Sequence, residues 1–159
     1  MRLNKGFTLI ELIVVIAIVA LLSFFLGAFI INTMDTYVFV KVREKGLSDM
    51  RLALNRMTRE LKHIDEPQLI LSMEATECEF VKVGTGVVDL RQIGTDLYLD
   101  SDILLSGLVS PEGLSFFYYD ASGNPTSTAG DVRSIKVRLH VLRSGEEITL
   151  ESRSKIRNE

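Results

Sequence analysis

A single carboxylate stands at the beginning of a long apolar segment. Glu11 is followed by 23 residues without a charged side chain, LIVVIAIVALLSFFLGAFIINTM, before Asp35. A carboxylate inside an apolar helix costs about 2.5–3.5 kcal/mol at the centre of a bilayer unless it reaches water or a positive partner. Glu11 is therefore either a boundary residue that extends toward lipid headgroups or a group that pairs with a positive charge.

The rest of the sequence offers no recognisable catalytic arrangement. His63 and His140 are far apart, and neither has neighbours at the spacing of a metal-ligand pair. A G-x-S-x-G elbow, a phosphate-binding loop and a dinucleotide fingerprint are all missing from the sequence. We therefore predict a protein that is not an enzyme and that has no cofactor.

Two further groups of residues could do chemistry in principle. Asp96, Asp100 and Asp102 could hold calcium, but they lack the spacing and the glycine of an EF-hand loop, so we predict no metal site. The only cysteine, Cys78, lies between Glu77 and Glu79. Neighbouring carboxylates raise the pKa of a thiol, so we expect an unreactive side chain.

Length and composition limit the class of protein. The chain has 159 residues, which allow one domain, or two if one part is not globular. A charged fraction of 25% excludes general disorder, and one cysteine excludes an internal disulfide. A net charge of −3 argues against a dedicated nucleic-acid binder. The mean hydropathy, +0.22, is high for a small soluble domain.

The apolar segment after Glu11 accounts for that high hydropathy. As a helix, 23 residues would extend roughly 35 Å, which is enough to cross the ~30 Å core of a bilayer. The alternatives are a buried core helix, which is usually shorter, and a cleaved secretory signal. A secretory signal would end in small residues, and only Gly27-Ala28 offers such a site. We interpret the segment as a membrane anchor that is retained.

The residues before the anchor carry a specific resemblance. Arg2 and Lys5 precede Gly6, and the string KGFTLIEL that starts at Lys5 resembles the processing signal of type IV prepilins and type II secretion pseudopilins. The resemblance implies cleavage after Gly6 by a prepilin peptidase and N-methylation of the new terminus, Phe7. It also implies that Glu11 neutralises the terminal amine of a neighbouring subunit, an attraction that is strong at low dielectric.

The same resemblance implies partners and a location. The partners are the prepilin peptidase and methylase, other pilin or pseudopilin subunits, an inner-membrane assembly platform and membrane lipid, and no nucleic acid is expected. The chain would cross the cytoplasmic membrane once, with its N-terminus in the cytoplasm and its head outside, and would then enter a filament. Charge alone leaves the orientation undecided, because Lys41, Arg43 and Lys45 follow the anchor.

Beyond the anchor, the apolar period becomes that of an amphipathic helix that ends before Pro67. We expect four parts: a leader (residues 1–6), a transmembrane and assembly helix (7–34), an amphipathic helix (35–66) and a β-rich head (67–159). The predicted buried positions of the amphipathic helix are Val38, Val42, Met50, Leu54, Met57, Leu61 and Ile64.

Short strands and turns are predicted after residue 67. The expected strands are Gln68–Met73, Glu79–Val83, Val87–Ile93, Asp96–Leu99, Leu114–Tyr119, Ser134–Leu142 and Glu147–Ile156. Close spacing favours an antiparallel meander, and its apolar face needs the helix as cover. The predicted fold is α+β, with a long N-terminal helix packed on a small antiparallel sheet, as in pilins.

Charge is unevenly distributed along the chain. Residues 37–64 contain seven Lys or Arg against three Asp or Glu, whereas residues 65–159 contain nine against sixteen. Either these are two solvated surfaces, or the helix of one subunit matches the head of the next in charge.

Two further segments resemble a particular group within this family. The run RLALNRMTREL from Arg51 to Leu61, and the residues Ile156-Arg157-Asn158, are similar to minor pilins and J-type pseudopilins. Many major pilins have a cysteine pair and a proline in the membrane helix, and this chain has neither. Both departures favour a low-abundance minor subunit, in priming or at the tip. The alternative function is a membrane-anchored binding module that does not polymerise.

Overall fold

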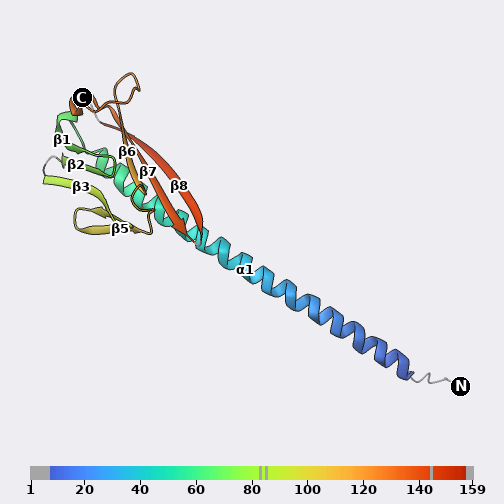
Figure 1. Cartoon of the computed structure of the whole chain (residues 1–159). Coiled ribbons are helices and arrows are strands. Elements are labelled where there is room, and N and C mark those ends of the chain that lie inside the picture. Colours follow the sequence, from blue (N-terminus) through green and yellow to red (C-terminus); the bar gives the residue numbers. More distant parts are fainter. Residues whose placement is uncertain (1–7, 83, 85, 144, 157–159) are drawn as a thin grey trace. The chain divides into compact units, whose positions relative to one another are not determined.

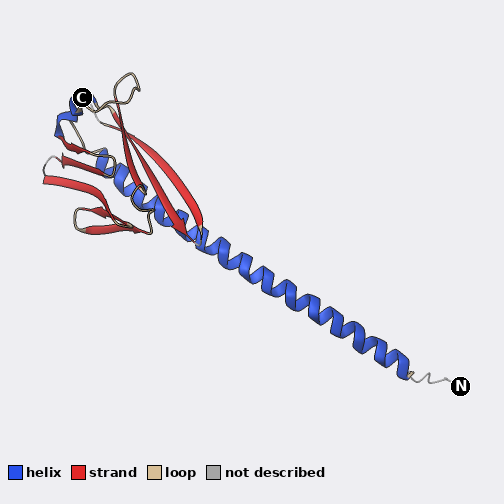
Figure 2. Ribbon diagram, viewed as in Figure 1, coloured by secondary structure: helices blue, strands red, loops and turns tan. Residues whose placement is uncertain are grey.

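The structure is a computed structural model that describes residues 8–82, 84, 86–143 and 145–156. The chain divides into two compact units, Met1–Lys41 and Val42–Glu159. Helix α1 (Leu9–Leu61) contributes residues to both units, whereas every described strand belongs to the second (Figure 2). The predicted long N-terminal helix is thus confirmed, and its described part begins two residues after Phe7.

The second unit contains two antiparallel sheets (Figure 1). In each sheet, strands that follow one another in the sequence are neighbours. The five-stranded sheet consists of β1 (Ile70–Met73), β2 (Glu77–Lys82), β3 (Gly86–Ile93), β4 (Asp96–Leu99) and β5 (Asp102–Ser106). The three-stranded sheet consists of β6 (Leu114–Tyr119), β7 (Ser134–Arg143) and β8 (Glu146–Lys155). Two short 3₁₀ helices, η1 (Pro67–Leu69) and η2 (Ala129–Asp131), complete the described elements.

One hydrophobic core joins both sheets to the C-terminal part of α1. The helix contributes Met50, Ala53, Leu54, Met57 and Leu61, at spacings of three and four residues that place them on one face. From the sheets come alternate residues of the strands, among them Phe80, Leu90, Leu97, Phe116, Ile135, Val137 and Leu139. Gln92 links the sheets, because its Oε1 accepts the N–H of Leu114 at 2.8 Å.

The α+β class is confirmed, and several details of the prediction need correction. The strands are arranged in two sheets and not in one, and β5 was not predicted. β4 and β6 have the predicted limits, whereas the predicted strand Gln68–Met73 begins only at Ile70, because Gln68 and Leu69 belong to η1. Val38 and Val42 are 59% and 37% exposed, although the helical period placed them on the buried stripe.

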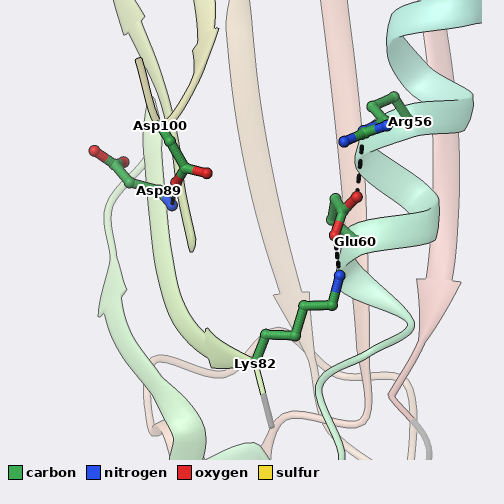
Figure 3. A network of polar contacts seen from close by, with 5 residues as sticks. All are labelled: Arg56, Glu60, Lys82, Asp89 and Asp100. Atoms are coloured by element: carbon green, nitrogen blue, oxygen red, sulfur yellow. Dashed lines mark hydrogen bonds and ion pairs between the residues drawn. The ribbon is translucent and has the colours of Figure 1, made fainter. Parts of the chain in front are cut away.

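An ion network around one buried carboxylate fastens the helix to the five-stranded sheet (Figure 3). Glu60 on α1 is only 6% exposed, and its Oε2 accepts a hydrogen bond of 2.8 Å from Lys82 Nζ at the end of β2. Its other oxygen lies 3.2 Å from Arg56 Nε, one turn earlier on the helix. Burial raises the pKa of Glu60, but the hydrogen bond and the charges of Lys82 and Arg56 outweigh it and lower the pKa below its ordinary value of 4.5.

The lowered pKa of Glu60 predicts a specific dependence of stability on pH. Since the folded state favours the ionised group, Glu60 stabilises the fold fully above pH 4.5, and this contribution is lost as the pH falls through the lower, folded pKa. We expect Glu60→Gln to reduce the free energy of unfolding by about 1–3 kcal/mol at pH 7. Urea unfolding of the full chain in detergent micelles, repeated between pH 7 and pH 3, measures the difference.

The curves of the variant and the unmodified protein should approach each other below pH 4.5 and converge only once the pH has fallen past the lower, folded pKa of Glu60, where the group is protonated in both states. Glu44→Gln is the matched control, because Glu44 is an exposed carboxylate on the same helix. That variant should follow the unmodified protein at every pH. Parallel curves for Glu60→Gln, with a constant difference, would contradict a stabilising role for the ionised group.

Candidate functional site

The described part of α1 begins with a reciprocal pair of hydrogen bonds between Thr8 and Glu11. The backbone N–H and the hydroxyl of Thr8 both donate to Glu11 Oε2, at 2.8 and 2.9 Å. In return, the N–H of Glu11 donates to Thr8 Oγ1 at 3.4 Å, and the carbonyl of Thr8 accepts the first helical bond from Leu12. This arrangement is a capping box, which satisfies N–H groups that a helix start leaves without partners.

Thr8 is a residue of this site that the sequence reasoning missed. A serine or threonine followed three residues later by a glutamate is the sequence pattern of a capping box, and Thr8-Leu9-Ile10-Glu11 matches it. The pattern alone could therefore have predicted both the helix start and the partner of Glu11. Both Thr8 donors contact Oε2, and the part of the chain that the structure describes places no hydrogen bond on Oε1.

The first part of α1, which carries Glu11, is apolar on all of its faces. Between Leu9 and Met34, each large apolar side chain is about half exposed or more, from 49% for Val14 to 76% for Leu9. By length and composition α1 is the one described helix that could cross a membrane. A helix that is apolar all round needs a bilayer or other helices to cover it, so this part of α1 fits a single-pass membrane anchor.

The remaining predicted site residues lie outside the described residues. These are the leader charges Arg2 and Lys5, the cleavage position Gly6 and the methylation position Phe7. Of the predicted site, the structure therefore places Glu11 alone, at the third residue of the helix and directly after Thr8-Leu9-Ile10.

Three other side chains that the sequence offered as candidates for chemistry, Cys78, His140 and Asp100, are buried or have partners within the fold. Cys78 is fully buried in β2, and burial raises the pKa of its thiol to about 12, so the thiolate is not accessible at neutral pH. His140 Nε2 lies 3.2 Å from an oxygen of Glu147 on the neighbouring strand. Asp100 is in a turn with a positive φ of 56°, and its Oδ1 accepts the N–H of Asp89 at 2.9 Å.

Within residues 8–156, apart from the gaps at 83, 85 and 144, no three His, Cys, Asp or Glu side chains come together as a metal site. Asp96, Asp100 and Asp102 belong to the β4–β5 region, where Asp100 holds the backbone of β3. Asp100 thus has a local structural role, whereas Asp96 is half-exposed and Asp102 is exposed.

Comparison with known proteins gives one family match. The model of the prokaryotic N-terminal methylation motif matches residues 1–27, which include Gly6, Phe7, Glu11 and the first 16 of the 23 residues of the apolar segment. No curated protein and no solved structure matches the chain significantly. The N-terminus of this chain is therefore a type IV prepilin-like signal, and the fold behind it, one long helix packed against antiparallel sheets, is consistent with that of pilins.

Proposed function

We propose that this chain is a minor pilin or pseudopilin, a structural subunit of a type IV pilus-like filament or of a type II secretion pseudopilus. The observation that carries the proposal is the methylation motif at residues 1–27, which leads directly into a helix with exposed apolar side chains on every face. A membrane covers such a helix before assembly, and the helices of neighbouring subunits cover it afterwards.

The proposed maturation begins at the leader. A prepilin peptidase cleaves after Gly6, where the absence of a side chain leaves the backbone accessible. Cleavage removes Arg2 and Lys5 and creates a new amine at Phe7, which the same membrane machinery methylates. The head then lies outside the cytoplasm, and an assembly platform in the inner membrane moves the subunit into the filament.

In this proposal Glu11 selects subunits during assembly. The terminal amine at Phe7 is a positive charge in an apolar environment, where a carboxylate attracts it far more strongly than in water. The capping box supports this role, because Thr8 fixes the carboxylate through Oε2 and the described hydrogen bonds leave Oε1 open to a donor from another subunit. Charge neutralisation then compensates for the cost of moving Glu11 into an apolar filament core.

The first test is the chemical identity of the N-terminus. Mass spectrometry of the chain purified from its native membrane should find a protein that begins with N-methylated Phe7. A leader variant, Gly6→Leu, should keep all of its residues, because a large side chain obstructs the cleavage site. An intact Met1 in the unmodified protein would contradict processing, and it would favour the anchored binding module that does not polymerise.

A second test separates the charge of Glu11 from its capping role. Glutamine also completes a capping box, so Glu11→Gln keeps the helix start and removes only the negative charge. We expect normal cleavage of this variant and at least a tenfold loss from the sheared filament fraction, measured by immunoblotting.

Glu11→Ala, which removes both the charge and the cap, should show the same loss. Glu44→Gln provides the control, since it neutralises an exposed carboxylate on the same helix and should enter filaments normally. Normal incorporation of Glu11→Gln would exclude charge neutralisation as the assembly step.

A further inference from the structure

The outward side of the three-stranded sheet concentrates positive charge. Because Ile135, Val137 and Leu139 point into the core, the alternate residues of β7 face outward, and those paired with them on β6 and β8 share that face. We call this surface the basic face, and it consists of Phe117, Tyr119, Lys136, Arg138, Arg153 and Lys155. Glu147 and Glu151 are the carboxylates that β8 adds to the same side.

The cations of the basic face are held in place by the sheet itself. Lys136 Nζ and the guanidinium of Arg138 lie 4.5 and 4.9 Å from the centre of the Phe117 ring. Arg153 covers the Tyr119 ring at 4.3 Å, and it donates a hydrogen bond of 2.8 Å to a serine hydroxyl on β7. The charges are therefore fixed before any partner arrives, which reduces the entropic cost of binding.

This arrangement fits carboxylates better than nucleic acid. Single-stranded nucleic acids bind through aromatic rings on which bases stack. Here the Phe117 and Tyr119 rings are already covered by Lys136, Arg138 and Arg153. Glu151 already pairs with Arg138 at 2.6 Å and with Lys136 at 3.5 Å, so a carboxylate is the partner to which these cations donate. The described residues form no ion pair with Arg153 or Lys155, and these two cations face outward beside that cluster.

The outward side of the five-stranded sheet has the opposite charge. The strand register places Glu77 opposite Arg91 and Glu79 opposite Asp89, and Figure 3 shows the side chain of Asp89 beside that of Asp100. We call this surface the acidic face, and it consists of Glu77, Glu79, Asp89, Asp96 and Asp100, with Arg91 as the single cation among them. Arg91 forms an ion pair with Asp89.

Like charges on the acidic face destabilise it in isolation. Glu79 and Asp89 are directly paired across β2 and β3, and two carboxylates opposite each other repel. Glu77, Glu79 and Asp96 are half-exposed, and the described residues form no ion pair with them. A cationic surface that approaches this face therefore relieves repulsion as well as adding attraction.

We propose that the basic face of one copy of this chain docks on the acidic face of a second copy. The proposal rests on the function proposed above, and it names a contact between neighbouring heads. The two faces belong to different sheets, so the contact joins unlike surfaces and leaves one free face on each copy. Head-to-tail contacts of this kind generate open helical assemblies, whereas a self-complementary contact closes after two copies. The contact requires at least two adjoining copies of the chain, and in this respect it departs from the single tip or priming position that the sequence favoured.

Engineered cysteines test the contact in assembled filaments. Thr149 is exposed and lies opposite His140 on the side of the basic face, and Ser72 lies opposite Glu79 on the acidic face. Thr149→Cys and Ser72→Cys are made in separate, differently tagged full chains, and both are expressed in cells that lack the unmodified chain. Cys78 is fully buried and does not interfere with oxidation by copper phenanthroline.

We expect a disulfide-linked product that contains both tags, and no such product between two copies of Thr149→Cys. Lys155→Glu on the basic face, or Glu79→Lys on the acidic face, should reduce the mixed product at least tenfold. Arg51→Glu is the matched control, because it reverses an exposed charge on α1, outside both faces, and it should leave the yield unchanged.

Three results would overturn the inference. A filament fraction that contains the chain without the mixed product leaves the proposed function intact and excludes the contact. A product between two copies of Thr149→Cys alone indicates a self-complementary contact instead. If the full chain in detergent binds a fluorescent single-stranded oligonucleotide and Lys155→Glu abolishes this binding, the basic face serves nucleic acid. Absence of the chain from the filament fraction, by contrast, rejects the proposed function itself and the contact that rests on it.

Discussion

The apolar surface of the first part of α1 must be covered by something that the described residues do not supply. Eighteen large apolar side chains between Leu9 and Met34 are about half exposed or more. Full burial of such a side chain stabilises by about 1.5–3 kcal/mol, so their combined burial amounts to tens of kcal/mol. A single carboxylate, Glu11, costs only about 2.5–3.5 kcal/mol at mid-bilayer. The segment therefore enters an apolar environment despite the cost of Glu11. Within that environment, the Glu11 carboxylate needs a hydrogen-bond donor or a positive charge as its partner.

The apolar surface of the second part of the same helix is buried against other residues of the chain. Here the apolar residues are restricted to one face, from Met50 to Leu61, and the two sheets cover that face. Glu60 is buried beside this apolar face, and Lys82 from β2 and Arg56 from α1 compensate its charge. A buried carboxylate that lost one of these cations would destabilise the helix–sheet contact, so the network also fixes the helix against the sheet.

Sequence periodicity predicted some elements accurately and could not predict others. β4 alternates between buried leucines and more polar residues, and β6 is a short run of aromatic residues after Leu114-Ser115, which favours a strand; the limits of both were correct. β5 contains three consecutive apolar residues, and an irregular register between Leu97 and Tyr98 interrupts its pairing with β4, so it shows no period of two. Val38 and Val42 continue the helical stripe but are exposed, because periodicity does not indicate where the covering sheet ends. The number of sheets depends on contacts between distant residues, and local patterns do not contain that information.

The net charge of a segment does not show how its charged side chains are distributed over the surface of the folded protein. Residues 65–159 have a large excess of carboxylates, sixteen Asp or Glu against nine Lys or Arg. Strand alternation, however, places Lys136 and Arg138 on one side of β7 and aligns them with Arg153 on β8, while Glu79 and Asp89 meet on the other sheet. The net charge of a segment thus constrains its solubility and its long-range field. Which partner a face can bind depends on the charged side chains that lie on that face, and the register of the strands determines which side chains these are.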